Sequence, residues 1–273
     1  MSSRISEAFS RVQADRRMAF MPFITAGDPD LATTQNLVRE LAARGVDLIE
    51  VGFPYSDPIA DGPVIQASYT RVLDRKLHIR DIFASFAELT QGAKETLPPL
   101  VAMVAYSIIF RTGPEAFVRK AKESGFSGLI VPDLPGDEAD DLAALARKHD
   151  LDLVQLVAPT TPPARAERIL KSCSGFVYCI SVAGTTGVRQ ELPEELREQL
   201  KWLRTKTNLP LAVGFGISRP EQVGSLRGTA DGVIVGSAIV RHLEPLSKPN
   251  ADRSATLRQI GEFAGKMVDA CRG

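Results

Sequence analysis

Two carboxylates, Glu50 and Asp61, are the residues of this sequence best suited to proton-transfer chemistry. Residues 46–52, Val-Asp-Leu-Ile-Glu-Val-Gly, have the composition of a buried strand, and side chains along a strand alternate between two faces. Glu50 therefore shares a face with the apolar Leu48, where burial raises a carboxyl pKa toward the range useful for acid–base catalysis near neutral pH. Asp61 follows on the adjoining loop. Either residue alone could be structural, but together they suggest a catalytic pair.

Short apolar runs alternate with amphipathic stretches along the whole chain, which is typical of parallel strands connected by helices. We predict eight strands, at residues 19–25, 48–52, 100–106, 128–131, 153–157, 176–180, 211–215 and 232–235. The predicted helices cover residues 31–44, 79–92, 114–124, 137–149, 164–172, 193–206, 220–226 and 257–271. Ile5, Phe9 and Val12 add an N-terminal helix packed on the domain, and the polar stretch 244–255 is expected at the surface.

Eight strand–helix units predict an α/β fold, a (β/α)8 TIM barrel, and the 273 residues fit one such domain spanning residues 1–273. Barrel enzymes carry out their chemistry at the carboxyl ends of the strands. Glu50, Tyr106 and Tyr178 all fall at or near such ends in the predicted arrangement.

The ends of the last two strands have the sequence of a phosphate site. Gly214-Phe215-Gly216 ends the seventh strand, and Gly236-Ser237 follows the eighth before a short apolar helix. Glycines allow the main chain to approach a ligand closely, and the first N–H groups of a helix attract anions. Because these two loops frequently bind phosphate in this fold, we predict a small phosphorylated substrate.

The loop at residues 181–189, Ser-Val-Ala-Gly-Thr-Thr-Gly-Val-Arg, could be a lid over the substrate or a plain surface loop. No predicted strand contains a lysine that could form a Schiff base, and His78, His149 and His242 are too dispersed for a zinc site. No dinucleotide fingerprint follows the first strand. We therefore expect carboxylate acid–base catalysis without a cofactor or a metal.

Composition sets the remaining expectations. Lys+Arg and Asp+Glu both number 33, so the net charge is zero and favours neither nucleic acid nor a membrane surface as a partner. The uncharged apolar run at residues 97–110 is too short to span a bilayer. Three cysteines without metal or redox spacing favour free thiols and a cytoplasmic location.

Five segments together resemble the tryptophan synthase alpha chain family, and the resemblance extends along nearly the whole sequence. They are Pro22-Phe23-Ile24-Thr25-Ala26-Gly27-Asp28-Pro29, Ile49-Glu50-Val51-Gly52-Phe53-Pro54-Tyr55-Ser56-Asp57-Pro58, Ala60-Asp61-Gly62-Pro63, Val131-Pro132-Asp133-Leu134-Pro135 and Gly214-Phe215-Gly216-Ile217. The resemblance implies an indole-3-glycerol-phosphate lyase that yields indole and glyceraldehyde 3-phosphate. It also implies an alpha2beta2 assembly with a pyridoxal-phosphate-dependent beta chain.

The resemblance also assigns roles to residues. Glu50 would move protons at indole C3 and at the glycerol hydroxyl, and Asp61 would bind the indole N–H and stabilise its developing positive charge. Substrate-binding positions implied in the same way, or suggested by an aromatic ring at a strand end, are Phe23, Tyr106, Tyr178, Thr186, Gly187, Phe215, Gly216, Gly236 and Ser237.

Two positions depart from the family pattern. Ser107-Ile108 follows Tyr106 where asparagine and proline are usual, and Thr185 precedes Thr186 where valine is usual. Two alternatives remain open: another phosphosugar barrel enzyme of aromatic amino-acid biosynthesis, such as an isomerase or indole-glycerol-phosphate synthase, and a non-catalytic subunit that activates a partner.

Overall fold

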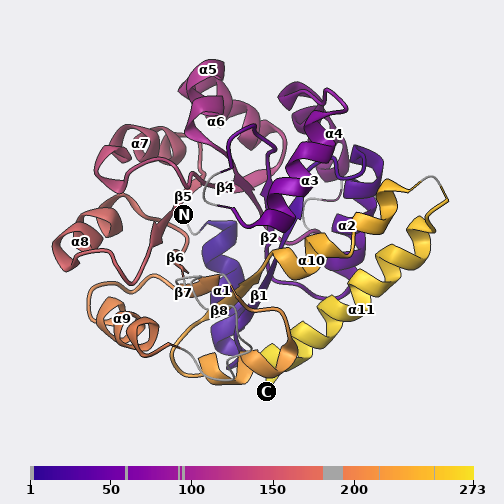
Figure 1. Ribbon diagram of the computed structural model, residues 1–273. Helices are drawn as coiled ribbons and strands as arrows, with labels where there is room; N and C mark the ends of the chain where they lie inside the picture. Colours follow the sequence, from indigo (N-terminus) through magenta and orange to yellow (C-terminus); the bar gives the residue numbers. More distant parts are fainter. Residues whose placement is uncertain are drawn as a thin grey trace.

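The computed structural model describes residues 3–58, 61–91, 93, 96–180, 193–214, 216–248 and 250–273. Its centre is a closed barrel of eight parallel strands in sequence order, with β8 pairing back to β1 (Figure 1). The strands are β1 (Ala19–Thr25), β2 (Ile49–Gly52), β3 (Leu100–Met103), β4 (Phe126–Ile130), β5 (Asp152–Val157), β6 (Val177–Ile180), β7 (Leu211–Gly214) and β8 (Gly232–Val235). The predicted barrel and its eight strands are confirmed.

Helices surround the barrel (Figure 1). They are α1 (Arg4–Ala14), α2 (Leu31–Ala43), α3 (Pro63–Leu73), α4 (Ile79–Thr90), α5 (Tyr106–Thr112), α6 (Pro114–Glu123), α7 (Asp140–Lys148), α8 (Pro163–Ser172), α9 (Glu194–Arg204), α10 (Ser237–Arg241) and α11 (Arg253–Arg272), with the 3-10 helices η1 (Gly136–Glu138), η2 (Pro220–Leu226) and η3 (Glu244–Ser247). Within the described residues, no helix is both long enough and apolar enough to cross a membrane.

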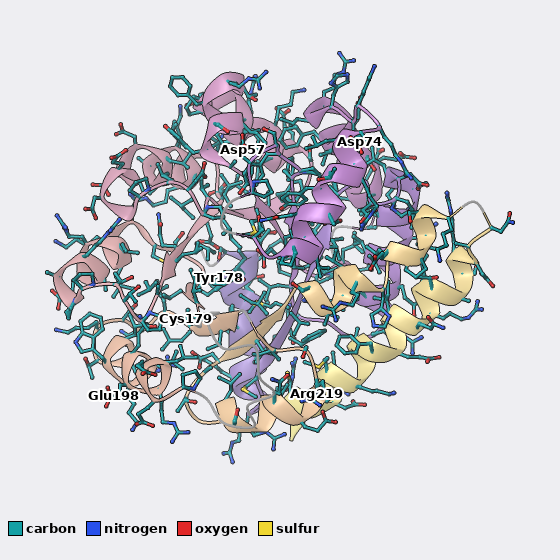
Figure 2. All side chains as sticks on the ribbon, in the orientation of Figure 1. Asp57, Asp74, Tyr178, Cys179, Glu198 and Arg219 are labelled. Carbon is teal, nitrogen blue, oxygen red and sulfur yellow. The ribbon has the colours of Figure 1, made fainter. Side chains whose placement is uncertain are left out.

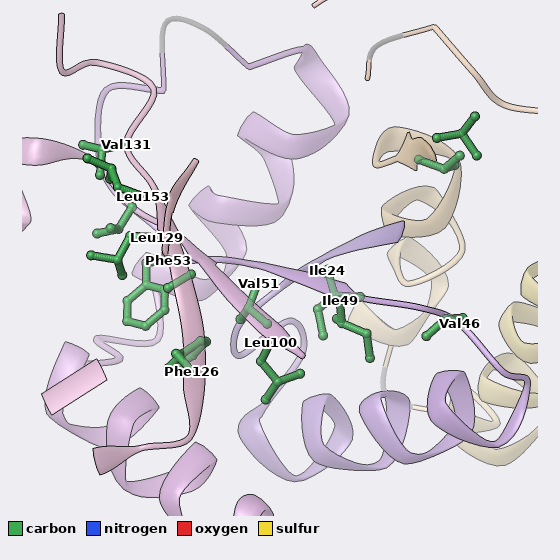
Figure 3. Close-up of a cluster of buried hydrophobic side chains, with 14 of the residues drawn as sticks. Ile24, Val46, Ile49, Val51, Phe53, Leu100, Phe126, Leu129, Val131 and Leu153 are labelled. Atoms are coloured by element: carbon green, nitrogen blue, oxygen red, sulfur yellow. The ribbon is translucent and has the colours of Figure 1, made fainter. Parts of the chain in front are cut away.

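Two layers of apolar side chains hold this arrangement together. The outer layer fills the space between the strands and the surrounding helices, and it includes Ile49, Val51 and Phe53 (Figure 3). The inner layer fills the barrel and includes Leu48. The predicted alternation along the second strand is therefore confirmed, and it directs Glu50 into the barrel.

The N-terminal helix covers the amino-terminal ends of the strands. Ser3 caps α1 by accepting the N–H of Ser6 at 3.1 Å, and its hydroxyl donates to Asp152 Oδ2 at the start of β5 at 2.5 Å. Phe9 enters the inner layer, with its ring centroid 5.6 Å from that of Phe176. Since this end is filled by apolar side chains, a ligand must use the opposite end.

The structure differs from the predicted elements at one strand end and at three helices. β3 ends at Met103, so the prediction that it continues to residue 106 was wrong; Tyr106 instead begins α5, and its N–H donates to Asp133 Oδ1 at 2.7 Å. An acidic side chain satisfying an N-terminal N–H stabilises a helix at that point. The helices α3 and α5 were not predicted, and the segment predicted as a helix over residues 220–226 is a 3-10 helix.

Candidate active site

A cavity of about 620 Å³ opens at the carboxyl ends of the strands. Seven of the residues expected at the site line it: Phe23, Glu50, Asp61, Tyr178, Gly216, Gly236 and Ser237. Figure 2 shows Tyr178 inside the ring of helices. Sequence positions as distant as 23 and 237 thus meet in one cavity.

Of the remaining expected residues, Tyr106 alone lies in the described part of the chain. Tyr106 does not line this cavity; its side chain packs against the outer layer, and its ring centroid lies 6.4 Å from that of Phe110. The expectation that Tyr106 forms a wall of the pocket failed because the chain leaves β3 before this residue. Thr186, Gly187 and Phe215 lie outside the described residues, as does the segment predicted as a lid.

Glu50 is held rigidly between two neighbouring strands. It pairs in register with Phe23 of β1 and with Val101 of β3. Its side chain is only 4% exposed, and neither carboxyl oxygen has a hydrogen-bond partner within the described part of the chain. Burial, and secondarily the nearby charge of Asp61, raise the pKa of Glu50 from 4.5 to about 8.

Asp61 enters the cavity from the segment between β2 and α3. Its N–H donates to the Pro58 carbonyl at 3.0 Å, and the next residue, Gly62, is the N-cap of α3. Burial raises the pKa of Asp61 from 3.8 to about 6. Between about pH 6 and 8, Glu50 is therefore protonated while Asp61 is ionised, which gives the cavity one proton donor and one fixed negative charge.

The aromatic rings of Phe23 and Tyr178 line the cavity, and glycines at two strand ends make room for them. A Cβ atom at Gly52 would lie 2.4 Å from Phe23 Cζ, and one at Gly214 would lie 2.5 Å from Tyr178 Oη. No such contact is sterically possible without displacing a ring. The glycines that end β2 and β7 are thus required by the positions of the two rings.

The end of the cavity formed after β7 and β8 has the features of an anion site. Gly216 has φ +84, a conformation that favours glycine, and Gly236 is the N-cap of α10. Gly236, Ser237 and Ala238 line the cavity at the start of that helix, where the first N–H groups lack intrahelical acceptors. These features could hold a phosphate group.

Sequence reasoning missed several residues of the cavity. Arg219, Arg241 and His242 bring cationic or titratable side chains to its lining, and Ile65 brings an apolar one from α3. Arg219, Arg241 and His242 follow the predicted phosphate-binding loops closely in sequence, and this closeness could have identified them as lining residues. Ile65 was missed because α3 was not predicted.

Within the described residues, no group of three or more His, Cys, Asp or Glu side chains could hold a metal ion. Cys173, Cys179 and Cys271 are free thiols. Burial raises the pKa of the Cys173 thiol to about 12, which makes it a poor nucleophile at neutral pH. Glu50 and Asp61 are the carboxyl groups that line the described cavity.

Comparisons with known proteins agree with this geometry. The sequence model of the family "Tryptophan synthase alpha chain" matches residues 9–272. The tryptophan synthase alpha chain of Rhodopirellula baltica is 44% identical over 269 residues, covering 98% of this chain and 97% of the relative, and that of Gloeobacter violaceus is 45% identical over 268 residues, covering 98% and 94%.

Solved structures give the same result. Tryptophan synthase subunit alpha from Legionella pneumophila superposes with a TM-score of 0.89 at 32% identity, covering 99% of both chains. A chain of Mycobacterium tuberculosis tryptophan synthase superposes with a TM-score of 0.88 at 32% identity, covering 100% of both chains. The matches extend over the strands and helices that form the cavity, and the chain belongs to the tryptophan synthase alpha chain family.

Proposed function

We propose that this chain cleaves indole-3-glycerol phosphate to indole and glyceraldehyde 3-phosphate, with Glu50 and Asp61 as the catalytic residues. The observation that carries the proposal is the pair of carboxyl groups with separated pKa values in one cavity whose far end suits a phosphate. Family membership supplies the substrate, because the geometry alone specifies only an apolar group joined to an anion.

Protonated Glu50 delivers its proton to C3 of the indole ring, and the ring becomes a cation that can accept electrons. Ionised Asp61 accepts a hydrogen bond from the indole N–H and stabilises that positive charge. The hydroxyl on the adjoining glycerol carbon then returns a proton to Glu50 as its C–O bond becomes a carbonyl. The carbon–carbon bond breaks, its electron pair neutralises the ring, and both products leave with all atoms and protons balanced.

Indole release by the purified chain tests these roles. Glu50→Gln removes the transferable proton and Asp61→Asn removes the stabilising charge, so each is expected to lower kcat by at least about 100-fold while changing phosphate-ligand affinity little. Glu115→Gln is the matched control, since Glu115 is exposed on α6 and pairs with Lys148 and His149. Wild-type activity in Glu50→Gln would refute the assignment. No indole release by the wild-type chain, alone or with a beta chain, would leave the activating-subunit alternative.

We also propose that the beta chain docks on the loops that follow β2, β3 and β4. Phe110 on α5 is 70% exposed, the one large apolar side chain in the described residues that is mostly exposed. Ile108 and Arg111 of the same helix line a cavity of about 520 Å³, together with Tyr55, Asp57 and Asp133 among others. An aromatic side chain exposed beside a concave surface is suited to a protein partner. Because Asp57 belongs to the same connection as Asp61, a partner bound there would adjoin the active site.

Phe110→Asp is therefore expected to weaken binding to a purified beta chain by at least about tenfold, measured by calorimetry, with indole release by the free chain unchanged. Glu198→Lys on α9 is the control, because Glu198 lies well apart from Asp57 on the molecule (Figure 2). Undiminished affinity in Phe110→Asp would place the partner elsewhere.

The cytoplasmic location inferred from the cysteines stays a prediction.

A further inference from the structure

A buried polar cluster joins the exit of β1 to the helix that follows Asp61. Asp28 is 1% exposed and lies just after β1. It accepts hydrogen bonds from Arg71 Nη2 at 2.5 Å, Arg71 Nε at 3.2 Å and Ser68 Oγ at 2.5 Å. The Ser68 hydroxyl also lies 2.8 Å from Thr25 Oγ1. We call Asp28, Ser68 and Arg71 the α3 clamp, since two of the three residues lie on α3.

Further contacts fix the same helix to the same turn. Arg75, which follows α3, donates to the Pro29 carbonyl. A Cβ atom at Gly27 would lie 2.4 Å from Leu77 Cδ2 and 3.2 Å from Val72 Cγ1, so this backbone approaches the end of α3 closely. The C-terminal half of α3 therefore has one position relative to β1, and a helix transmits that position rigidly to its first turn.

The first turn of α3 in turn contacts the backbone at Asp61. Gln66 Nε2 donates to the Asp61 carbonyl at 2.8 Å and to the Pro58 carbonyl at 3.2 Å. Glu50 is held on both sides by neighbouring strands, whereas Asp61 lies outside any strand or helix. The separation of the two carboxyl groups consequently depends on α3.

We propose that the α3 clamp is a positioning device for the reaction: through α3 and Gln66, Asp28, Ser68 and Arg71 hold the Asp61 carboxylate at its working distance from Glu50. None of the three clamp residues lines the cavity, so they act on the substrate through Asp61. The inference rests on the proposed function, because it assigns a purpose to the position of a residue that the proposed mechanism uses.

An ion pair at the opposite end of the barrel provides a matched control. Arg17 and Asp47 form a bidentate pair with both N–O distances 2.8 Å, with the two side chains 15% and 9% exposed. Arg71 and Asp28 are similarly shielded, at 21% and 1%. Replacing either arginine by lysine keeps the charge but removes the planar fork that makes two hydrogen bonds. The two substitutions thus perturb similar pairs, and one of them lies far from the cavity.

Steady-state kinetics of Arg71→Lys and Arg17→Lys test the proposal. Arg71→Lys is expected to lower kcat about tenfold with KM changed less than about threefold, because the anion end of the cavity is built from β7 and β8. Its alkaline limb in kcat/KM is expected at lower pH than in the wild type, since a displaced Asp61 no longer opposes ionisation of Glu50. Tyr55, Tyr69 and Tyr178 also face these carboxylates, and their raised pKa values keep them neutral through this range.

Two further variants distinguish a loss of positioning from a folding defect. Ser68→Ala removes one hydrogen bond to Asp28 and leaves the arginine in place. Gln66→Leu alters an exposed side chain that donates directly to the Asp61 carbonyl. Both are expected to lower kcat and to shift the alkaline limb in the same direction as Arg71→Lys. Arg17→Lys is expected to lower Tm comparably while leaving kcat and the limb unchanged.

The proposal is overturned if Arg71→Lys, Ser68→Ala and Gln66→Leu all keep the wild-type kcat and alkaline limb. It is also overturned if Arg17→Lys lowers kcat as much as Arg71→Lys does, because a general loss of barrel stability would then explain both effects. Failure of the proposed function is distinguishable, since it would appear as full activity in Glu50→Gln or as no indole release by the wild-type chain.

Discussion

The properties of Glu50 follow from its being enclosed without a hydrogen-bond donor among the described residues. A buried carboxylate in that position is costly, so the group keeps its proton to a higher pH. The pKa of Asp61 is raised less, because Asp61 is less deeply buried and no like charge is among the causes of its shift. In the proposed mechanism, this difference between the two environments makes Glu50 the acid and Asp61 the anion.

This difference predicts a bell-shaped pH dependence of kcat/KM. Activity is expected to rise as Asp61 ionises near pH 6 and to fall as Glu50 loses its proton near pH 8, which gives a maximum near pH 7. Asp61→Asn is expected to abolish the acid limb of the residual activity. It should also move the alkaline limb to lower pH, since the charge of Asp61 contributes to the raised pKa of Glu50.

Initial rates of indole release from about pH 5 to about pH 9 measure both limbs. An alkaline limb that does not move in Asp61→Asn would contradict the electrostatic coupling of the two groups. An acid limb that persists unchanged in that variant would show that another group controls it.

Among the elements, the strands were predictable from the sequence and the helices α3 and α5 were not. The strands are near-continuous apolar runs, as expected when both faces of a parallel sheet are covered, and all eight were found. α3 begins after Gly62 with Pro63, a pair with the composition of a turn, and its buried face includes the polar Ser68. α5 has only 7 residues, and it depends on a contact that no local pattern contains, the hydrogen bond from the Tyr106 N–H to Asp133.

The candidate site was predictable to a similar extent. Glu50 and the glycines after β7 and β8 could be found because each depends on one strand and the loop that follows it. The α3 clamp could not, because Asp28 and Arg71 are 43 positions apart and meet only when α3 packs on β1. The position of Tyr106 was missed for a related reason, since Asp133, which accepts its N–H at the start of α5, lies on another loop.

At the scale of the whole molecule, the two ends of the barrel differ in how they are filled. α1 fills the amino-terminal end with apolar side chains and adds stability. The carboxyl end keeps an enclosed carboxyl group without a partner among the described residues, which a protein selected for stability alone would not retain. Active sites commonly retain such destabilising groups, so activity and stability are opposed here.

The raised pKa of Glu50 predicts how the stability of the folded chain depends on pH. The pKa of Glu50 is about 8 in the folded chain and near 4.5 when the residue is exposed, so the folded state holds this proton more tightly. The resulting stabilisation is fully present below about pH 4.5 and is lost as the pH rises to about 8. Glu50→Gln has no proton to lose. Its free energy of unfolding, relative to the wild type, is therefore expected to increase by about 2–4 kcal/mol between about pH 5 and about pH 8.

Urea unfolding of both proteins at several pH values measures this difference, and groups common to the two proteins cancel. Asp61 contributes with the same sign over a lower range, from 3.8 to about 6, and is present in both. Glu167→Gln is the control: pairing with Lys206 lowers the pKa of this exposed residue, so it should not alter the slope above about pH 5. Parallel stability curves for the wild type and Glu50→Gln would mean that Glu50 is already ionised in the folded chain, and the proton donor would have to be sought elsewhere in the cavity.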